Sequence, residues 1–303
     1  MFILPKSVTI IEVGPRDGLQ NNHNLVAEND KIEFIHLLQE AGIKEMEITS
    51  FVSPKWVPQM ADAAQIVAKT RKIGRQFVLA PNEKGATLAR EAHVDSIAVF
   101  VGVSNSFNKK NINRSTKESM DSLEPVIAKL KREQIFVRAC ISTAFYCPYE
   151  GKMDQDDVLA VCEQFVKMGV DELSVADTIG MANPLESYTL FTTLKEQFPT
   201  TLLTAHFHDT RKMALANIFA ALQAGIDRFD TSAGGLGGCP FAPGATGNVA
   251  TEDVVNMLDR LGIQTGVDIE KICEAVECIE KHVSQPIETG MYKLYKNKKC
   301  QRS

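Results

Sequence analysis

The residues best suited to chemistry lie in and around a glycine-rich run, GGLGGCP at residues 234–240. Glycines let this backbone adopt almost any φ and ψ, while Pro240 stiffens the step after the thiol of Cys239. A flexible loop that carries one thiol is typical of an active-site lid, which brings a nucleophile or a proton-transfer group to a substrate. A tight turn with a bystander cysteine is the alternative interpretation of this run.

Two histidines precede the run and an asparagine follows it. His206 and His208 stand two residues apart, so on a strand both imidazoles share one face and Phe207 takes the other. Two imidazoles on one face favour a divalent-metal pair, and the alternative is one ligand beside a hydrogen-bonded core histidine. With Asp17 and Asn248 they form a set of one carboxylate, two imidazoles and an amide oxygen, which suits Mg²⁺ or Mn²⁺. Such a set leaves coordination positions open for substrate oxygens.

A fixed cation stands beside a carboxylate in EVGPRDGLQ, residues 12–20. Arg16 can stabilise a developing oxyanion, and Asp17 can bind a metal or take a proton. A turn with a local ion pair is the alternative. Glu47 ends the second predicted strand and is expected to point inward, where an unpaired carboxylate is unfavourable. We therefore expect Arg16 to be the partner of Glu47.

Two further polar groups follow predicted strands. Asp177 ends the sixth strand and either supports the metal set or caps a short turn. The segment 107–114, FNKKNINR, follows the fourth strand, and its cations either contact the phosphates of an anionic substrate or form a solvated charge run. The candidate substrate contacts in this segment are Lys109, Lys110, Asn111 and Asn113, with Arg114 beside them.

Short β-rich segments alternate with longer amphipathic segments along the whole chain. The predicted strands are 8–12, 45–49, 76–79, 96–101, 136–142, 172–176, 202–208 and 228–232. The predicted helices are 30–41, 61–72, 83–92, 116–134, 155–168, 185–198, 213–224, 251–261 and 268–282. Eight strands, each followed by a helix, favour an α/β fold in the form of a closed (β/α)8 TIM barrel with an extra C-terminal helix. An open doubly wound sheet is the alternative.

A closed barrel would bring the candidate residues together. Catalytic residues of such barrels lie at the C-terminal ends of the strands and in the loops that follow. The metal set and its neighbours follow the first, second, seventh and eighth strands, which are consecutive because the eighth strand pairs with the first. We expect a single domain over residues 1–303, with the barrel over about 8–262 and a C-terminal helical extension over about 267–303.

Composition and charge argue against several classes of protein. The net charge is −5 and no basic patch dominates, which makes nucleic acid an unsuitable partner. No apolar run is long enough to span a membrane, and the N-terminus does not have the pattern of a signal or transit peptide. The seven scattered cysteines indicate neither a zinc site nor disulfides, so reduced thiols in the cytoplasm are expected. Cys300, in a polar tail over 296–303, is expected to be an exposed bystander.

These motifs resemble those of the 3-hydroxy-3-methylglutaryl-CoA lyase family, within the wider superfamily of divalent-metal TIM-barrel lyases and condensing enzymes. The resemblance covers nearly the whole chain. The segments that carry it are EVGPRDGLQN (12–21), EITSFVSPKWVPQM (47–60), FNKKNIN (107–113), ADTIGMANP (176–184), HFHDT (206–210) and GGLGGCPFAPGATGN (234–248). Arg-Asp-Gly and His-x-His belong to the wider superfamily, whereas FVSPKWVPQM and GGLGGCP are far more specific to the lyase.

The resemblance implies cleavage of 3-hydroxy-3-methylglutaryl-CoA to acetyl-CoA and acetoacetate, as in leucine degradation and ketone-body chemistry. The metal ligands that it implies are Asp17, His206, His208 and Asn248. The catalytic positions that it implies are Arg16, Asp17, Glu47, Asp177, His206 and Cys239. Among these, Arg16 matches the residue that stabilises the enolate, and Cys239 matches the thiol on the mobile loop. A bacterial-type cytoplasmic homodimer with an acyl-CoA substrate is the corresponding expectation, with 268–282 as a candidate dimer contact.

Two alternatives remain open at the level of sequence. An acyl-CoA-dependent condensing synthase or an aldolase would keep the metal site but should lack the GGLGGCP lid. A non-catalytic barrel that binds CoA esters would have no need for the combined metal and proton-transfer set.

Overall fold

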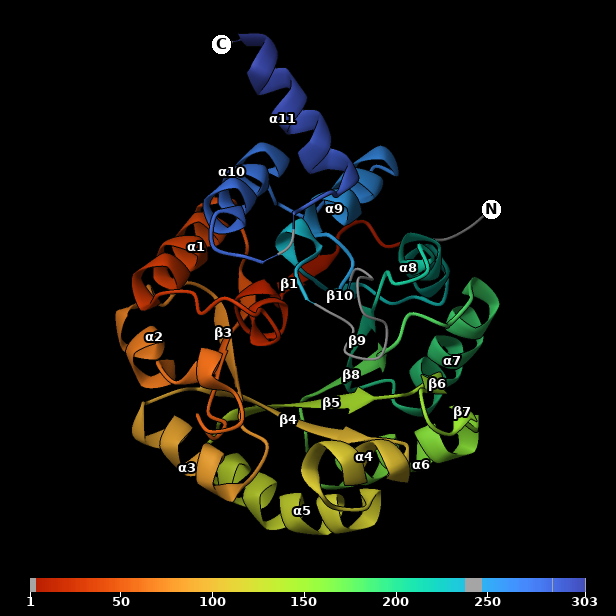
Figure 1. The fold of residues 1–303 in the computed structure, drawn as a ribbon. Coiled ribbons are helices and arrows are strands. Elements are labelled where there is room, and N and C mark those ends of the chain that lie inside the picture. The colour runs from red at the N-terminus through yellow and green to blue at the C-terminus, as the bar shows by residue number, and fades with distance from the viewer. Residues whose placement is uncertain (1–3, 238–246, 285, 303) are drawn as a thin grey trace.

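Eight parallel strands close into a barrel, and helices surround it on the outside (Figure 1). The structure, a computed structural model, describes residues 4–237, 247–284 and 286–302. The barrel strands are β1 (Thr9–Glu12), β2 (Glu45–Ser50), β3 (Arg75–Leu79), β4 (Ser96–Gly102), β5 (Phe136–Ser142), β8 (Glu172–Asp177), β9 (Leu202–Phe207) and β10 (Arg228–Thr231). Their order is β1-β10-β9-β8-β5-β4-β3-β2, so the last strand pairs with the first and the TIM-barrel prediction is confirmed.

The helices follow the strands in alternation. They are α1 (Glu28–Glu40), α2 (Ala63–Lys69), α3 (Glu83–Glu91), α4 (Asn105–Ile112), α5 (Thr116–Arg132), α6 (Gln155–Lys167), α7 (Pro184–Gln197), α8 (Ala214–Gln223), α9 (Thr251–Arg260), α10 (Ile269–Glu280) and α11 (Gly290–Arg302). A small hairpin of β6 (Tyr146–Cys147) and β7 (Gly151–Lys152) follows β5. Every predicted strand is present with ends within one residue. The sequence did not predict α4, and it predicted a C-terminal helical extension over about 267–303 without assigning α11 as a separate helix. None of the helices in the described ranges is long and apolar enough to cross a lipid bilayer.

Helix α4 replaces the irregular charge run considered for 107–114. Ser104 caps its start, because its Oγ accepts a hydrogen bond from Phe107 N at 3.0 Å. Asn113 ends the helix in the left-handed region at φ +55°, a conformation that asparagine tolerates better than most residues. Asn108 anchors it to β4, exchanging hydrogen bonds with the backbone of Gly102. The helix is short and mostly polar, so its periodicity alone did not predict it.

Helix α11 lies in the expected helical extension and includes residues 296–302 of the segment expected to be a polar tail. It extends away from the barrel beyond α9 and α10 (Figure 1). Tyr292 anchors its first turn, since its side chain is fully buried and its ring stacks on Tyr295 with centroids 6.1 Å apart. Cys300 lies near the end of this helix and is exposed.

Side-chain alternation in β9 fixes which residues enter the barrel. Phe207 points outward and packs against Phe145 and Phe191, with ring centroids 6.1 and 6.0 Å away. Burial of such a ring stabilises the fold by roughly 2–3 kcal/mol, which holds the strand in one register. The residues on either side of Phe207 therefore face the barrel interior, as the sequence predicted.

Candidate metal centre and catalytic site

A tight π-helical turn, Gly14–Gly18, carries Arg16 and Asp17 to the mouth of the barrel directly after β1. The backbone amides of Asp17 and Gly18 donate to Val13 O at 2.8 and 3.1 Å. The buried carboxylate of Glu12 accepts from Gly14 N at 2.7 Å and also from Ala233 N. Glu12 therefore fixes this turn against the loop after β10, and π-type turns are frequent at functional sites.

His206 and His208 face each other at the end of β9, with ring centroids 5.2 Å apart. A candidate ligand atom of each lies within 4.8 Å of a carboxylate oxygen of Asp17, which makes these three residues a group able to hold a metal ion. The residues come from opposite ends of the chain, and the pairing of β1 with β10, next to β9, brings them together. The predicted convergence is thus present in the fold.

Asn248 joins this group from the segment that follows β10. Its backbone forms an isolated β-bridge with His208, and its Nδ2 donates to Asp17 Oδ2 at 2.8 Å and to Leu236 O at 3.1 Å. Gly237, at φ +123°, lies so close that a Cβ there would be 2.7 Å from Asn248 Nδ2. Glycine is therefore required at this position to leave room for the amide.

Asp17, His206, His208 and Asn248 are called the metal group below, and their polar atoms suit a divalent cation. Within the described part of the chain, buried Asn248 Oδ1 and His208 Nδ1 have no hydrogen-bond partner. An unpaired buried polar atom is unfavourable unless something else satisfies it. A carboxylate, imidazole nitrogens and an amide oxygen are donors that Mg²⁺ and Mn²⁺ accept, so the residues present fit such an ion.

Burial and nearby charges hold Asp17 and His208 in protonation states that can bind a metal. Burial tends to raise the pKa of Asp17, but the charges of Arg16, His206 and His208 outweigh it and lower the pKa to about 2. Burial, together with the charge of His206, lowers the pKa of His208 to about 4. At neutral pH Asp17 is therefore an anion and His208 is neutral, which are the forms that coordinate metals.

Arg16 bridges two carboxylates at the mouth. Its Nη1 lies 2.7 Å from Asp17 Oδ1 and its Nη2 lies 2.8 Å from Glu47 Oε2 on β2. The predicted pair with Glu47 is therefore present. The Nε of Arg16 is buried and has no hydrogen-bond partner among the described residues.

Comparison with known proteins shows that residues 7–279 match the model of the HMGL-like family. The chain belongs to the HMGL-like family. A relative, the hydroxymethylglutaryl-CoA lyase YngG of Bacillus subtilis strain 168, is 44% identical over 97% of this chain and 99% of its own length.

Solved HMGL-like structures agree in fold. The crystal structure of hydroxymethylglutaryl-CoA lyase from Pseudomonas aeruginosa has a TM-score of 0.94 and 42% identity, over 97% of this chain and 99% of that one. An HMG-CoA lyase from Acinetobacter baumannii, in complex with coenzyme A and 3-methylmalate, has a TM-score of 0.90 and 33% identity, over 97% and 96% of the two chains.

Asp177 lies beside the metal group in this HMGL-like chain, because its backbone oxygen accepts a hydrogen bond from His208 N at 3.3 Å. Both carboxylate oxygens of Asp177 accept backbone hydrogen bonds, from Met181 N at 3.0 Å and Ala182 N at 2.9 Å, so this residue holds the turn after β8. Burial raises the pKa of Asp177 to about 6. Cys239 lies outside the described residues.

The candidate substrate contacts on α4 form a separate group. Lys109, Lys110, Asn111 and Asn113 are exposed on this helix and its C-terminal cap. Lys110 Nζ lies 3.7 Å from the ring centroid of Tyr149. Asn111 Nδ2 donates a hydrogen bond to Phe107 O at 2.9 Å. Asn113 ends the helix in the left-handed region, so both asparagines also have local structural roles.

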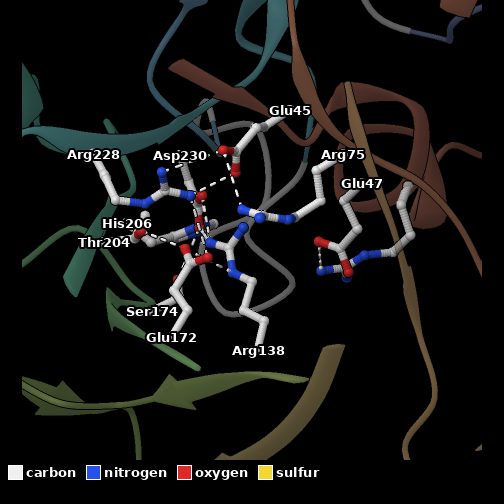
Figure 2. A network of polar contacts seen from close by, with 11 residues as sticks. Glu45, Glu47, Arg75, Arg138, Glu172, Ser174, Thr204, His206, Arg228 and Asp230 are labelled. Atoms are coloured by element: carbon white, nitrogen blue, oxygen red, sulfur yellow. Dashed lines mark hydrogen bonds and ion pairs between the residues drawn. The ribbon is translucent and has the colours of Figure 1, made fainter. Parts of the chain in front are cut away.

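The sequence did not predict a buried network of charged side chains, which contacts the metal group at His206 (Figure 2). It joins Arg138 on β5 to Asp230 on β10 at 2.5 Å, and Arg228 to Glu45 at 2.5 Å and to Glu172 at 3.2 Å. The signal was present as polar residues at alternate positions of otherwise apolar strands, since alternate side chains share one face. The pattern occurs in Glu45–Ser50, Phe136–Ser142, Glu172–Asp177, Leu202–Phe207 and Arg228–Thr231.

Proposed function

We propose that this chain cleaves 3-hydroxy-3-methylglutaryl-CoA to acetyl-CoA and acetoacetate, with Mg²⁺ or Mn²⁺ held by Asp17, His206, His208 and Asn248. The observation that carries the proposal is the convergence of this ligand set with the Arg16–Glu47 pair at one mouth of the barrel. The HMG-CoA lyases of similar sequence and structure support the choice of substrate. The chain is accordingly a carbon–carbon lyase.

The residues divide the chemistry between them. A divalent ion bound at this site supplies Lewis-acid polarisation, which lowers the pKa of the substrate's tertiary hydroxyl. Asp17, or a neighbour in the same set, takes the hydroxyl proton as the C2–C3 bond breaks and the C3 oxygen becomes the ketone of acetoacetate. The electron pair of that bond passes to the thioester as an enolate, whose oxygen is stabilised by the guanidinium of Arg16, held in place by Asp17 and Glu47.

Protonation of the enolate completes the reaction. Cys239 delivers the proton to C2 and yields acetyl-CoA. Glu47 supports the stabilisation of the enolate indirectly, because its hydrogen bond with Arg16 holds the guanidinium in place.

Lys109 and Lys110 on α4 are proposed to contact the phosphates of the CoA moiety. They follow β4, so they lie on the same end of the barrel as the metal group, where substrates of such barrels bind. A solved HMG-CoA lyase that contains coenzyme A supports a CoA ester as the ligand class.

We also infer a cytoplasmic homodimer. The six described cysteines are free thiols, which suits a reducing compartment. Helix α11 extends away from the barrel and exposes Leu294 to 54%, so the C-terminal helices offer an apolar contact for a second copy. Cell fractionation tests the location, and light scattering during gel filtration tests the assembly; a monomer at micromolar concentration would contradict the dimer.

The decisive test of function is acetoacetate release from 3-hydroxy-3-methylglutaryl-CoA by chelator-stripped protein, with and without added Mg²⁺ or Mn²⁺. Metal-dependent release is expected, and Asp17→Asn is expected to abolish most of it. A folded, metal-loaded sample that releases no acetoacetate would overturn the lyase assignment. The same protein would then be tested for condensing and aldol reactions.

A further inference from the structure

Asp230 is the residue at which the buried charge network meets the metal group (Figure 2). Its Oδ2 lies 3.1 Å from His206 Nδ1 and accepts a hydrogen bond from Ser174 Oγ at 2.9 Å. Arg138 Nη2 lies 2.5 Å from both carboxylate oxygens. One carboxylate therefore connects an arginine in the barrel interior to a candidate metal ligand.

The contact with Asp230 determines which nitrogen of His206 carries the proton. An ionised carboxylate only accepts hydrogen bonds, so a neutral His206 must place its proton on Nδ1. Its Nε2 then keeps a lone pair, which is the form that a metal ion requires. His208 differs, because its buried Nδ1 has no hydrogen-bond partner in the described ranges.

Arg138 and Ser174 hold Asp230 in the geometry that this requires. The Arg138 side chain is only 1% exposed and also lies near Glu172, with Nε 3.6 Å from Oε1. It sits beside the Phe77 ring, 5.2 Å from the centroid. A guanidinium confined in this way keeps its carboxylate partner ionised and restricts its position.

We propose that Asp230 is a positioning residue that fixes His206 as the Nδ1–H tautomer and presents Nε2 to the metal, with Arg138 and Ser174 orienting the Asp230 carboxylate. This inference rests on the proposed metal site. Residues that orient metal-bound histidines from behind typically contribute about 10–100-fold in metal affinity. The sequence motifs predict roles for Glu47 and Asp177 and none for Asp230.

The test is Asp230→Asn, which keeps the size of the side chain but adds an amide donor. That donor can bind an unprotonated Nδ1 and so stabilise the Nε2–H tautomer, which cannot coordinate through Nε2. Two-bond ¹H–¹⁵N spectra of metal-free, histidine-labelled protein report the tautomer directly, with His206→Gln giving the assignment. The wild type is expected to show Nδ1–H at His206, and D230N is expected to show Nε2–H or a mixture.

Metal affinity is the second readout. Mn²⁺ titration followed by electron paramagnetic resonance is expected to give a Kd about 10–100-fold weaker in D230N. Thr204→Val is the matched control, because it removes the Thr204 Oγ1 to Glu172 Oε1 hydrogen bond from the same network without touching Asp230. It should leave both the tautomer and the Kd at wild-type values.

The outcomes separate this inference from the proposed function. Wild-type protein that shows Nε2–H at His206, or D230N with both readouts unchanged, would overturn the positioning role. Wild-type protein that shows Nδ1–H but binds no Mn²⁺ would instead overturn the metal site. If D230N does not fold, Ser174→Ala removes one of the hydrogen bonds to Asp230 and is expected to weaken Mn²⁺ binding by several-fold, and no weakening would contradict the role.

Discussion

Arg16 and Glu47 are separated by thirty residues of chain, yet the Nη2 of one lies 2.8 Å from Oε2 of the other. The second arm of the same guanidinium contacts Asp17 at 2.7 Å. A guanidinium that is hydrogen-bonded to two carboxylates cannot rotate freely, so the position of the Arg16 side chain is set before substrate binds. Preorganised charge of this kind stabilises a transition state without a reorganisation cost during the reaction.

Replacement of Arg16 by lysine should remove this arrangement while keeping the charge. A single ammonium cannot reproduce the planar fork that contacts both carboxylates. We expect Arg16→Lys to lower kcat by roughly 10²–10³ with a smaller change in KM. Steady-state acetoacetate release measures both, with Arg71→Lys as the control because Arg71 pairs with Glu40 on the surface. A kcat close to that of the control would refute the oxyanion role.

Loss of the Asn248 amide should weaken the metal site. Its Oδ1 is a proposed ligand and its Nδ2 orients Asp17, so Asn248→Ala removes two contributions at once. The expected result is a Kd for Mn²⁺ higher by about 10–100-fold, measured on chelator-stripped protein. Exposed Asn21→Ala serves as the control, and equal affinities for the two variants would exclude Asn248 from the ligand set.

The thiol of Cys239 should matter for turnover more than for binding. Cys239→Ala is expected to lower kcat by roughly 10²–10⁴ if this residue transfers a proton. Cys300→Ala, on the exposed end of α11, should leave kcat unchanged. A loss below about tenfold in C239A would remove Cys239 from the proton-transfer role.

The lysines of α4 should affect binding rather than chemistry. A Lys109→Ala, Lys110→Ala double variant is expected to raise KM for the CoA ester by roughly tenfold, because each lysine–phosphate ion pair in a partly solvated site contributes about 1 kcal/mol or less. Lys117→Ala is the control, because that exposed lysine pairs with Asp121 on α5. Raising the salt concentration should reduce the difference between variant and wild type, and a salt-independent KM in the wild type would contradict phosphate binding by these lysines.

Stability should depend on pH through Glu252. Burial raises the pKa of Glu252 to about 7, although hydrogen bonds from Thr289 and Gly234 oppose the shift. The folded state then binds more protons than the unfolded state between pH 4.5 and about 7, so the free energy of unfolding falls as pH rises through this range. Its contribution is at most about 3 kcal/mol. Urea denaturation at pH 5, 6, 7 and 8 should show a flatter profile for Glu252→Gln, and parallel profiles would refute this contribution.

The fold was predictable because barrel strands and helices carry different periodicities. Each strand of the barrel combines β-branched or aromatic residues with a turn signal, and the count of eight favours closure. Helices α4 and α11 were not assigned from the sequence, because neither shows a clear apolar stripe. Helix α4 is short and polar, and helix α11 is basic. Capping by Ser104 and burial of Tyr292 define them in the structure.

The site was predictable where spacing and topology decide it. Alternation placed both histidines inward, and closure brought Asp17 to them. The partners of inward residues were not predictable, because pairing across a barrel depends on strand stagger and on rotamers. Asp230 thus lies against His206, whereas Asp177 holds a backbone turn.

Alternation in β9 also limits how this gene can change. Insertion or deletion of one codon within Leu202–Phe207 would move each later side chain of the strand to the opposite face. The histidines would then face the helix layer, and Phe207 would face the barrel interior. Such a change would remove both imidazoles and the aromatic contact in one step. Length variation among descendants of this sequence should therefore collect in the loops outside the strand, such as Asp209–Met213, while β9 itself changes only by substitution.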